Sequence, residues 1–321
     1  MKLYLGIDGG GTKTGFVLCD HTGRVLAESL KPTSHYLQCG LDGVTRVLAE
    51  GLSDILKKTG IKPEDIAYAF VACGGYGDIK DDEEPIRAAV KTALLDIPHT
   101  VGNDCENALA GAMAGAPGIN IIAGTGSMGF GRNAAGESKR CGGWHHAIGS
   151  DEGSGYWIGI RLVQDFTRQS DGRLKKTPLY NAVKEALSLS ADGDIIARIV
   201  NDWKLDRGRI AALSPIVSTL YDQDDTCAKR ILHDAAQELA GIARAIRDNL
   251  FMSESIPVSY TGGVFKMGER ILAPFRAALE KDCMHLYAPL LPPDRGALIL
   301  SMQLDGAVLD SAVISRLAEG L

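Results

Sequence analysis

The sequence predicts an α/β fold with two domains, and three observations lead to this expectation. A glycine-rich loop occurs twice between apolar, strand-like runs, at residues 8–14 and 123–127. Strand and helix patterns alternate along the chain. The 321 residues exceed one typical hydrophobic core. Glycines let the main chain approach a ligand closely and adopt positive φ, so each loop can direct N–H groups at an anion. Two such loops across a cleft would hold one polyphosphate, which indicates a nucleotide-dependent phosphotransferase.

The first part of the chain is predicted to follow the order β-β-β-α-β-α-β-α. Strands are expected at residues 3–7, 15–19, 25–29, 66–73 and 99–102. Helices are expected at residues 43–59, 84–95 and 105–114. The helix over 43–59 is indicated by apolar residues at helical spacing, and Gly60 ends it.

A second series of strand and helix patterns begins at Ile119 with another hairpin. A glycine-rich stretch at 141–155 follows, and then the longest helix signal, over 226–250. A strand at 257–261 and helices at 268–281 and 296–303 complete the pattern. We expect the domain boundary near 112–118. The predicted domains are therefore 1–115 and 116–295, and a returning C-terminal helix at about 296–321 could complete the first.

Composition restricts the class of partner. The formal net charge is −6, and no basic cluster interleaved with aromatic residues is present, which argues against nucleic acid. No apolar run reaches the roughly 18–20 residues that span a bilayer, and the N-terminus has no signal-peptide pattern. The seven cysteines include no CxxC pair, which is typical of a reducing compartment. We expect a cytoplasmic protein without membrane partners.

The first loop differs from the two common phosphate-binding loops. A dinucleotide loop and a P-loop each open a helix, whereas this loop opens a strand. Asp8 at its start could hold a hydrated Mg²⁺ beside the phosphates. Thr12 and Lys13 could donate hydrogen bonds to phosphate oxygens. The alternative is a tight hairpin with a surface lysine.

Asp104 is the candidate general base. It follows a short strand and opens a helix, whose N-terminus would lower the pKa of the carboxylate and hold it rigid. In phosphoryl transfer to an alcohol, a positioned carboxylate accepts the hydroxyl proton. The alternative is an ordinary N-cap aspartate.

The segment 141–157 is dense in glycine, tryptophan, histidine and acid. A tryptophan face with a carboxylate and backbone amides is suited to a sugar ring. Trp157 is more typical of the core, and His145 and His146 fit a loop better than a zinc site, because further ligands at zinc spacing are missing. The turn Gly262-Gly263-Val264 could lie against a ribose or be an ordinary strand–helix turn.

Together these residues resemble a known family. The motifs are DGGGTKT at 8–14, GND at 102–104, AGTGS at 123–127, CGGW at 141–144, DEGSGYW at 151–157 and GGV at 262–264. In this order they resemble the BadF/BadG/BcrA/BcrD ATPase family, and within it the N-acetylglucosamine kinases and the bacterial glucosamine and N-acetylmuramic acid kinases. The first loop alone would indicate only the wider sugar kinase–Hsp70–actin superfamily.

The resemblance implies two ribonuclease-H-like domains around a cleft that binds ATP, Mg²⁺ and an amino sugar, with a homodimer as the expected assembly. It implies Asp104 as the base and Asp8 at the metal. It places at the sugar Ser34, His35, Asp104, Ser127, Gly143, Trp144, His145 and Asp151. It places at the nucleotide Gly10, Gly11, Thr12, Lys13, Thr125, Gly126, Gly262, Gly263 and, by a weaker match, Ala211.

Two departures from the family pattern concern the sugar. Ser34 stands where the kinases usually have asparagine, and the loop before Asp151 is one residue longer. The zinc motif of the ROK sugar kinases is absent. Two other function classes remain as alternatives: an iron–sulfur activator of 2-hydroxyacyl-CoA dehydratases, which would use Cys73 or Cys141, and a non-catalytic sugar sensor. Retention of Asp104 argues against the sensor.

Overall fold

The computed structural model describes residues 2–252 and 255–319. The chain divides into two compact units. Unit 1 comprises Met1–Pro117 and Ala288–Leu321, and unit 2 comprises Gly118–Tyr287. The C-terminal segment thus belongs to the N-terminal unit, although residues 320 and 321 of the segment expected at 296–321 lie outside the described residues.

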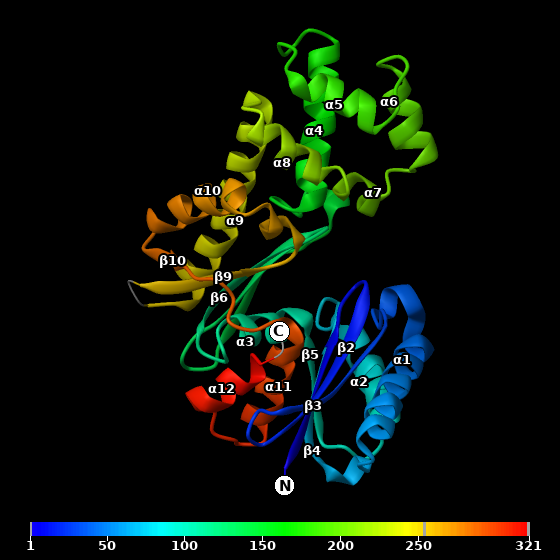
Figure 1. The fold of residues 1–321 in the computed structure, drawn as a ribbon, viewed down its shortest axis with the longest axis vertical. Coiled ribbons are helices and arrows are strands. Elements are labelled where there is room, and N and C mark those ends of the chain that lie inside the picture. Colours follow the sequence, from blue (N-terminus) through cyan, green and yellow to red (C-terminus); the bar gives the residue numbers. More distant parts are fainter. Residues whose placement is uncertain (1, 253–254, 320–321) are drawn as a thin grey trace. The chain divides into compact units, whose positions relative to one another are not determined.

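Unit 1 contains a five-stranded mixed sheet (Figure 1). Its strands are β1 (Leu3–Gly9), β2 (Lys13–Asp20), β3 (Val25–Pro32), β4 (Ile66–Cys73) and β5 (His99–Asn103). The order is β3-β2-β1-β4-β5, with the first three antiparallel and β1, β4 and β5 parallel. The apolar runs form the central strands because both faces of the sheet are covered.

Unit 2 repeats this topology. Its strands are β6 (Gly118–Ala123), β7 (Ser127–Arg132), β8 (Ser138–Gly142), β9 (Ile256–Thr261) and β10 (Met284–Leu286). The order is β10-β9-β6-β7-β8, which is the order of unit 1 read from the opposite edge of the sheet. Strands β6, β7 and β8 are antiparallel, and β6, β9 and β10 are parallel. Each glycine loop is the turn of the leading hairpin. The predicted α/β class is confirmed.

Helices cover both faces of the sheet in unit 1. One core contains α1 (Tyr36–Thr59) and α2 (Glu83–Leu94). The other contains α3 (Asp104–Ala112), α11 (Pro293–Leu304) and α12 (Ser311–Leu317). Helix α1 begins before the predicted residue 43, because a short first segment joins it across a kink at Gly40, where φ is 69°. Helix α12 and strand β10 were not predicted.

Helix α11 packs closely against α3. A Cβ at Gly296 would lie 1.9 Å from the backbone oxygen of Asn107, and one at Gly111 would lie 2.5 Å from the backbone oxygen of Pro292. Only glycine fits at such contacts, because backbone cannot move aside as a flexible side chain can. The C-terminal segment is therefore seated on the helix that begins at Asp104.

The helices of unit 2 are α4 (Gly155–Ser170), α5 (Pro178–Ala186), α6 (Asp194–Ile196), α7 (Arg207–Ala211), α8 (Ser214–Asp222), α9 (Thr226–Leu250) and α10 (Glu269–Glu280), with a π-helix at Ala197–Asp202. Single 3-10 turns occur at Pro63–Asp65, Lys80–Asp82, His146–Ile148 and Gly263–Met267. Helix α9 packs on β6, β7 and β8 (Figure 1). Among the described residues, none of the helices is both long enough and apolar enough to cross a membrane.

Candidate functional site

The first glycine loop joins β1 to β2. The N–H of Gly10 donates to the carbonyl oxygen of Lys13 at 3.1 Å, which closes the hairpin. None of the glycines 9–11, 124 and 126 has a positive φ, so the expectation of left-handed backbone in the two loops was wrong. The lack of room for a side chain explains why residue 9 is glycine, because a Cβ at Gly9 would lie 2.5 Å from the backbone oxygen of Ala72. Gly11, Thr12 and Lys13 are exposed at the turn, where their polar groups can meet a ligand.

Asn107 of α3 holds Asp8 at the end of β1. Asn107 Nδ2 donates to Asp8 Oδ1 at 2.8 Å and to the carbonyl oxygen of Pro293 at 2.9 Å. Burial raises the pKa of Asp8, the hydrogen bond from Asn107 lowers it, and the charge of Asp294 raises it. Asn107 Oδ1 is buried and accepts no hydrogen bond from the described residues. Oxygen-bearing side chains from β1, α3 and α11 therefore gather at this loop.

Asp104 is the first residue of α3, but Asn103 is its N-cap. The side-chain oxygen of Asn103 accepts from the N–H of Cys105 at 3.1 Å, and Glu106 accepts from the N–H of Asn103 at 2.8 Å. The capping box is thus complete without the Asp104 carboxylate. Asp104 Oδ2 lies beside Gly74, since it would be 3.6 Å from a Cβ there.

Ser34 and His35 lie near Asp104 and the first loop. Ser34 is 1% exposed, its Oγ accepts from Thr14 Oγ1 at 3.0 Å, and it would be 2.6 Å from a Cβ at Gly9. His35 Cδ2 would be 3.0 Å from a Cβ at Gly74. Burial lowers the pKa of His35, and its Nδ1 is buried without a hydrogen bond among the described residues. A neutral imidazole with an unused nitrogen can bind a substrate hydroxyl.

The second glycine loop in unit 2 is held by Asp151. Its Oδ1 accepts from the N–H of Ser127 at 3.2 Å, and its Oδ2 lies 2.7 Å from Nη2 of Arg207. Asp151 has a φ of 69° and is 2% exposed. The N–H of Tyr156 donates to the carbonyl oxygen of Thr125 at 3.2 Å, which ties the loop to the start of α4. Residues that are 24 positions apart, Ser127 and Asp151, are therefore brought into contact.

The segment after β8 presents an exposed tryptophan. The Trp144 side chain is exposed, with 75% of the residue accessible, and its backbone N–H donates to Ser150 Oγ at 3.1 Å. The carbonyl oxygen of Gly143 accepts from Arg140 Nη2 at 3.1 Å, and His145 adopts a φ of 99°. By contrast, Trp157 is 8% exposed in α4, which confirms that it is a core residue. An indole that is not used for packing remains available to a ligand.

The residues expected at the nucleoside also lie in unit 2. Gly262 has a φ of 108°, and a Cβ there would be 2.4 Å from the backbone oxygen of Ala123, so the turn after β9 touches the end of β6. A Cβ at Gly263 would meet nothing within 4 Å. The Cβ of Ala211 would lie 3.5 Å from a Cβ at Gly155, whose N–H donates to the carbonyl oxygen of Gly124. These residues therefore border the second loop.

Three polar residues at these sites were missed from the sequence: Asn107, Arg207 and Asp294. Asn107 could have been found, because it lies one helical turn after Asp104 on the same face. Arg207 precedes Ala211 by four residues, which is also about one helical turn. The sequence does not distinguish Asp294 as a site residue. It follows two prolines that mark a helix start, where an acidic residue is ordinary.

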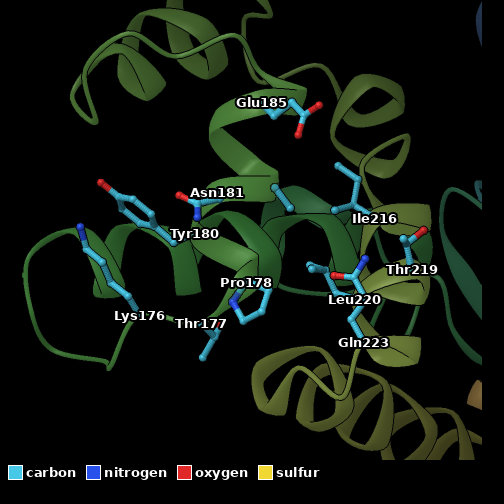
Figure 2. A pocket seen from close by; sticks show the side chains of 11 residues that line it. Lys176, Thr177, Pro178, Tyr180, Asn181, Glu185, Ile216, Thr219, Leu220 and Gln223 are labelled. Carbon is cyan, nitrogen blue, oxygen red and sulfur yellow. The ribbon is translucent and has the colours of Figure 1, made fainter.

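A cavity of about 750 Å³ lies elsewhere in unit 2, between α5 and α8 (Figure 2). Its walls include Tyr180, Asn181, Glu185 and Thr219. None of the residues predicted for the sugar or the nucleotide lines it. The chemical groups expected for phosphoryl transfer are therefore not at this cavity.

Cys73 is too deeply buried for a cluster shared between protomers. Cys73 is 2% exposed, and burial, together with the charge of Asp104, raises the pKa of its thiol to about 12. Burial also raises the pKa of Cys141. A cluster at an interface needs thiolates that reach the surface. The geometry of Cys73 therefore disfavours the iron–sulfur alternative.

The two sheets, each with a glycine loop in its leading hairpin, define an actin-like ATPase fold. A structure from Chromobacterium violaceum, of a protein assigned as an N-acetylglucosamine kinase, superposes with a TM-score of 0.74 at 25% identity and covers 94% of this chain and 99% of that chain. The model of the BadF/BadG/BcrA/BcrD ATPase family matches residues 5–289, and this chain belongs to that family. The predicted family and fold are confirmed.

Two curated relatives of this chain are amino-sugar kinases. An N-acetylmuramic acid/N-acetylglucosamine kinase from Clostridium acetobutylicum is 35% identical over 281 residues, which are 87% of this chain and 91% of the relative. An N-acetyl-D-glucosamine kinase from Dictyostelium discoideum is 30% identical over 272 residues, which are 82% of this chain and 85% of the relative.

Proposed function

We propose that this protein is an amino-sugar kinase that transfers the γ-phosphate of ATP to a hydroxyl of N-acetylglucosamine or a related sugar. The proposal rests on the positions of two side chains one turn apart on α3. Asp104 begins the helix, and Asn107, one turn later, holds Asp8 at the first glycine loop. One rigid helix thus carries a candidate proton acceptor and fixes a carboxylate at a phosphate loop.

In the proposed reaction, Asp104 accepts the proton of the sugar hydroxyl as its oxygen attacks the γ-phosphorus, and ADP leaves. Because Asn103 caps α3, the Asp104 carboxylate is not required for capping. The Nδ1 of His35, which has no hydrogen-bond partner among the described residues, is suited to orient the sugar near that carboxylate. Gly10, Gly11, Thr12 and Lys13 would meet the phosphates at the first loop.

The residues around Asp8 fit Mg²⁺, which prefers oxygen ligands. Asp8 and Asp294 supply charge, and the buried Asn107 Oδ1 has no hydrogen-bond donor among the described residues. We propose Asp8 as the residue that would hold the ion, directly or through its water. Bound Mg²⁺ would neutralise charge on the phosphates during transfer.

In unit 2, we assign Thr125 and Gly126 to the phosphates, and Ala211, Gly262 and Gly263 to the nucleoside. Ser127, Gly143, Trp144, His145 and Asp151 are assigned to the sugar. Support comes from the exposed indole of Trp144 and from the position of Asp151 at the second loop. A ring that stacks on an indole and donates hydroxyls to a carboxylate is held by both groups at once.

ADP release should be measured with N-acetylglucosamine, glucosamine, N-acetylmuramic acid, N-acetylgalactosamine, N-acetylmannosamine and glucose, each with and without Mg²⁺. At least one amino sugar should stimulate ADP release far above the sugar-free rate, and phosphorus NMR should show a sugar phosphate ester. If no amino sugar is phosphorylated, the proposal is wrong. A preference for N-acetylmuramic acid or glucosamine would identify one of the two alternative kinases.

A further inference from the structure

Arg207 lies directly against the second glycine loop. It is the first residue of α7, and its side chain is 35% exposed. A Cβ at Gly126 would lie 1.8 Å from Arg207 Nη2. The absence of a side chain at Gly126 therefore makes room for the guanidinium, which rests on the backbone of a loop that the proposed function assigns to phosphates.

Among the described residues, this guanidinium has one ion-pair partner, the carboxylate of Asp151. Arg207 Nη2 is 2.7 Å from Asp151 Oδ2, but the two groups are not aligned as a hydrogen bond, and Arg207 Nε is buried without a partner among the described residues. A guanidinium has five N–H donors in a planar fork. Most of this binding capacity is thus unused, although the charge is fixed beside the loop.

The pKa of nearby His146 responds to both members of the ion pair. Burial lowers it, the charges of His145 and Arg207 lower it further, and the charge of Asp151 raises it. Helix α7 also runs along the loop, because Arg207 contacts Gly126 and Ala211 borders Gly155. One short helix thus presents a cation and a small apolar residue to the same loop.

We propose that Arg207 binds a phosphate group of ATP at the second glycine loop, and that Asp151 holds the guanidinium in place until the nucleotide arrives. When phosphate binds, Arg207 exchanges the Asp151 carboxylate for phosphate oxygens, and the carboxylate becomes available to sugar hydroxyls. Arginine suits this exchange because it pairs with carboxylate and phosphate in the same fork geometry. The inference rests on the proposed function and adds a residue to its nucleotide site.

The test measures binding of Mg-ATP and of adenosine by calorimetry without sugar, in the wild type and in three variants. Arg207→Met removes the charge and keeps the stem, whereas Arg207→Lys keeps a point charge. Arg270→Met is the matched control, because Arg270 forms an exposed ion pair with Asp222 on the same unit. We expect Arg207→Met to weaken ATP by about 10- to 100-fold and to leave adenosine unchanged. The ATP affinity of Arg207→Lys should lie between those of the wild type and Arg207→Met, and the ATP affinity of Arg270→Met should match that of the wild type.

An unchanged ATP affinity in Arg207→Met, or an equal loss for adenosine, would overturn the assignment. ADP release by the same variants is measured in parallel with N-acetylmuramic acid and with N-acetylglucosamine. A loss confined to N-acetylmuramic acid, with ATP binding unaffected, would also overturn the assignment, because Arg207 would then bind the carboxylate of an acidic sugar. Melting temperatures identify a variant that fails to fold, and Arg207→Lys then carries the test. Wild type that binds ATP but phosphorylates no sugar would refute the kinase proposal and leave the assignment of Arg207 intact.

Discussion

Asn107 Nδ2 lies 2.8 Å from Oδ1 of Asp8, so a buried amide on α3 fixes the carboxylate at the first glycine loop. The same amide donates to the carbonyl oxygen of Pro293 at the start of α11. One side chain thereby joins β1, α3 and α11. Its loss should affect both the folding of unit 1 and the chemistry at Asp8.

Asn107→Ala should lower the free energy of unfolding by about 1–3 kcal/mol, because two acceptors lose their buried donor. It should also raise the Mg²⁺ concentration required for half-maximal activity, since Asp8 is no longer oriented. Denaturant unfolding and a Mg²⁺ titration measure the two effects. Asn249→Ala, which removes an exposed amide that donates to the Ala245 carbonyl oxygen, is the control. An unaltered Mg²⁺ requirement in Asn107→Ala would speak against the role of Asp8.

Asp151→Asn should raise the KM for the sugar by about 10-fold or more. The KM for ATP should change less, because Asp151 only holds Arg207 until phosphate replaces it. The carboxylate makes charge-assisted hydrogen bonds that an amide makes only weakly. Asparagine is chosen because it tolerates the φ of 69° at this position, where alanine would add strain. Glu152→Gln alters the adjacent carboxylate and is the control. Equal losses for sugar and ATP would mean that Asp151 is structural.

Trp144→Ala should raise the sugar KM by about threefold to 10-fold through lost stacking. Its effect on stability should stay within about 0.5 kcal/mol, because the side chain is 75% exposed. Sugar should also alter the tryptophan fluorescence of the wild type, and this change should vanish in Trp144→Phe. A persistent fluorescence change in that variant would assign the signal, and the sugar, to another tryptophan.

Gly296→Ala should destabilise the protein by about 2–4 kcal/mol, because the new Cβ would lie 1.9 Å from the backbone oxygen of Asn107. Gly241→Ala in α9 is the matched change, since a Cβ there meets nothing within 4 Å. It should stabilise by up to about 1 kcal/mol through helix propensity. Similar stabilities for the two variants would contradict the close packing of α11 on α3.

The sequence predicts most of the fold because apolar runs end at glycines and helical spacing is regular. Helix α9 spans the predicted residues 226–250, and β4 spans the predicted 66–73. Strand β10 has three residues and α12 has seven, too few for a periodic signal. Helix α1 starts early because Gly40 bends it, and a kink interrupts the helical pattern.

The candidate site is less predictable than the fold. The glycine loops, Asp8 and Asp104 carry local patterns, so the sequence identifies them. Asn107 is 99 positions from its partner Asp8, and no spacing rule links them. The contact between Arg207 and Gly126 likewise arises only when α7 folds onto the second loop. Such pairings depend on tertiary packing and therefore require the structure.

The most direct test of the proposed reaction is the turnover of Asp104→Asn. The amide keeps the shape of the side chain but cannot accept the hydroxyl proton, so kcat should fall by about 10²- to 10⁴-fold while ATP and sugar still bind. Asp96→Asn, an exposed carboxylate on the same unit, should match the wild type. If Asp104→Asn retains near-normal kcat with the preferred sugar, Asp104 is not the base and the proposed mechanism is wrong.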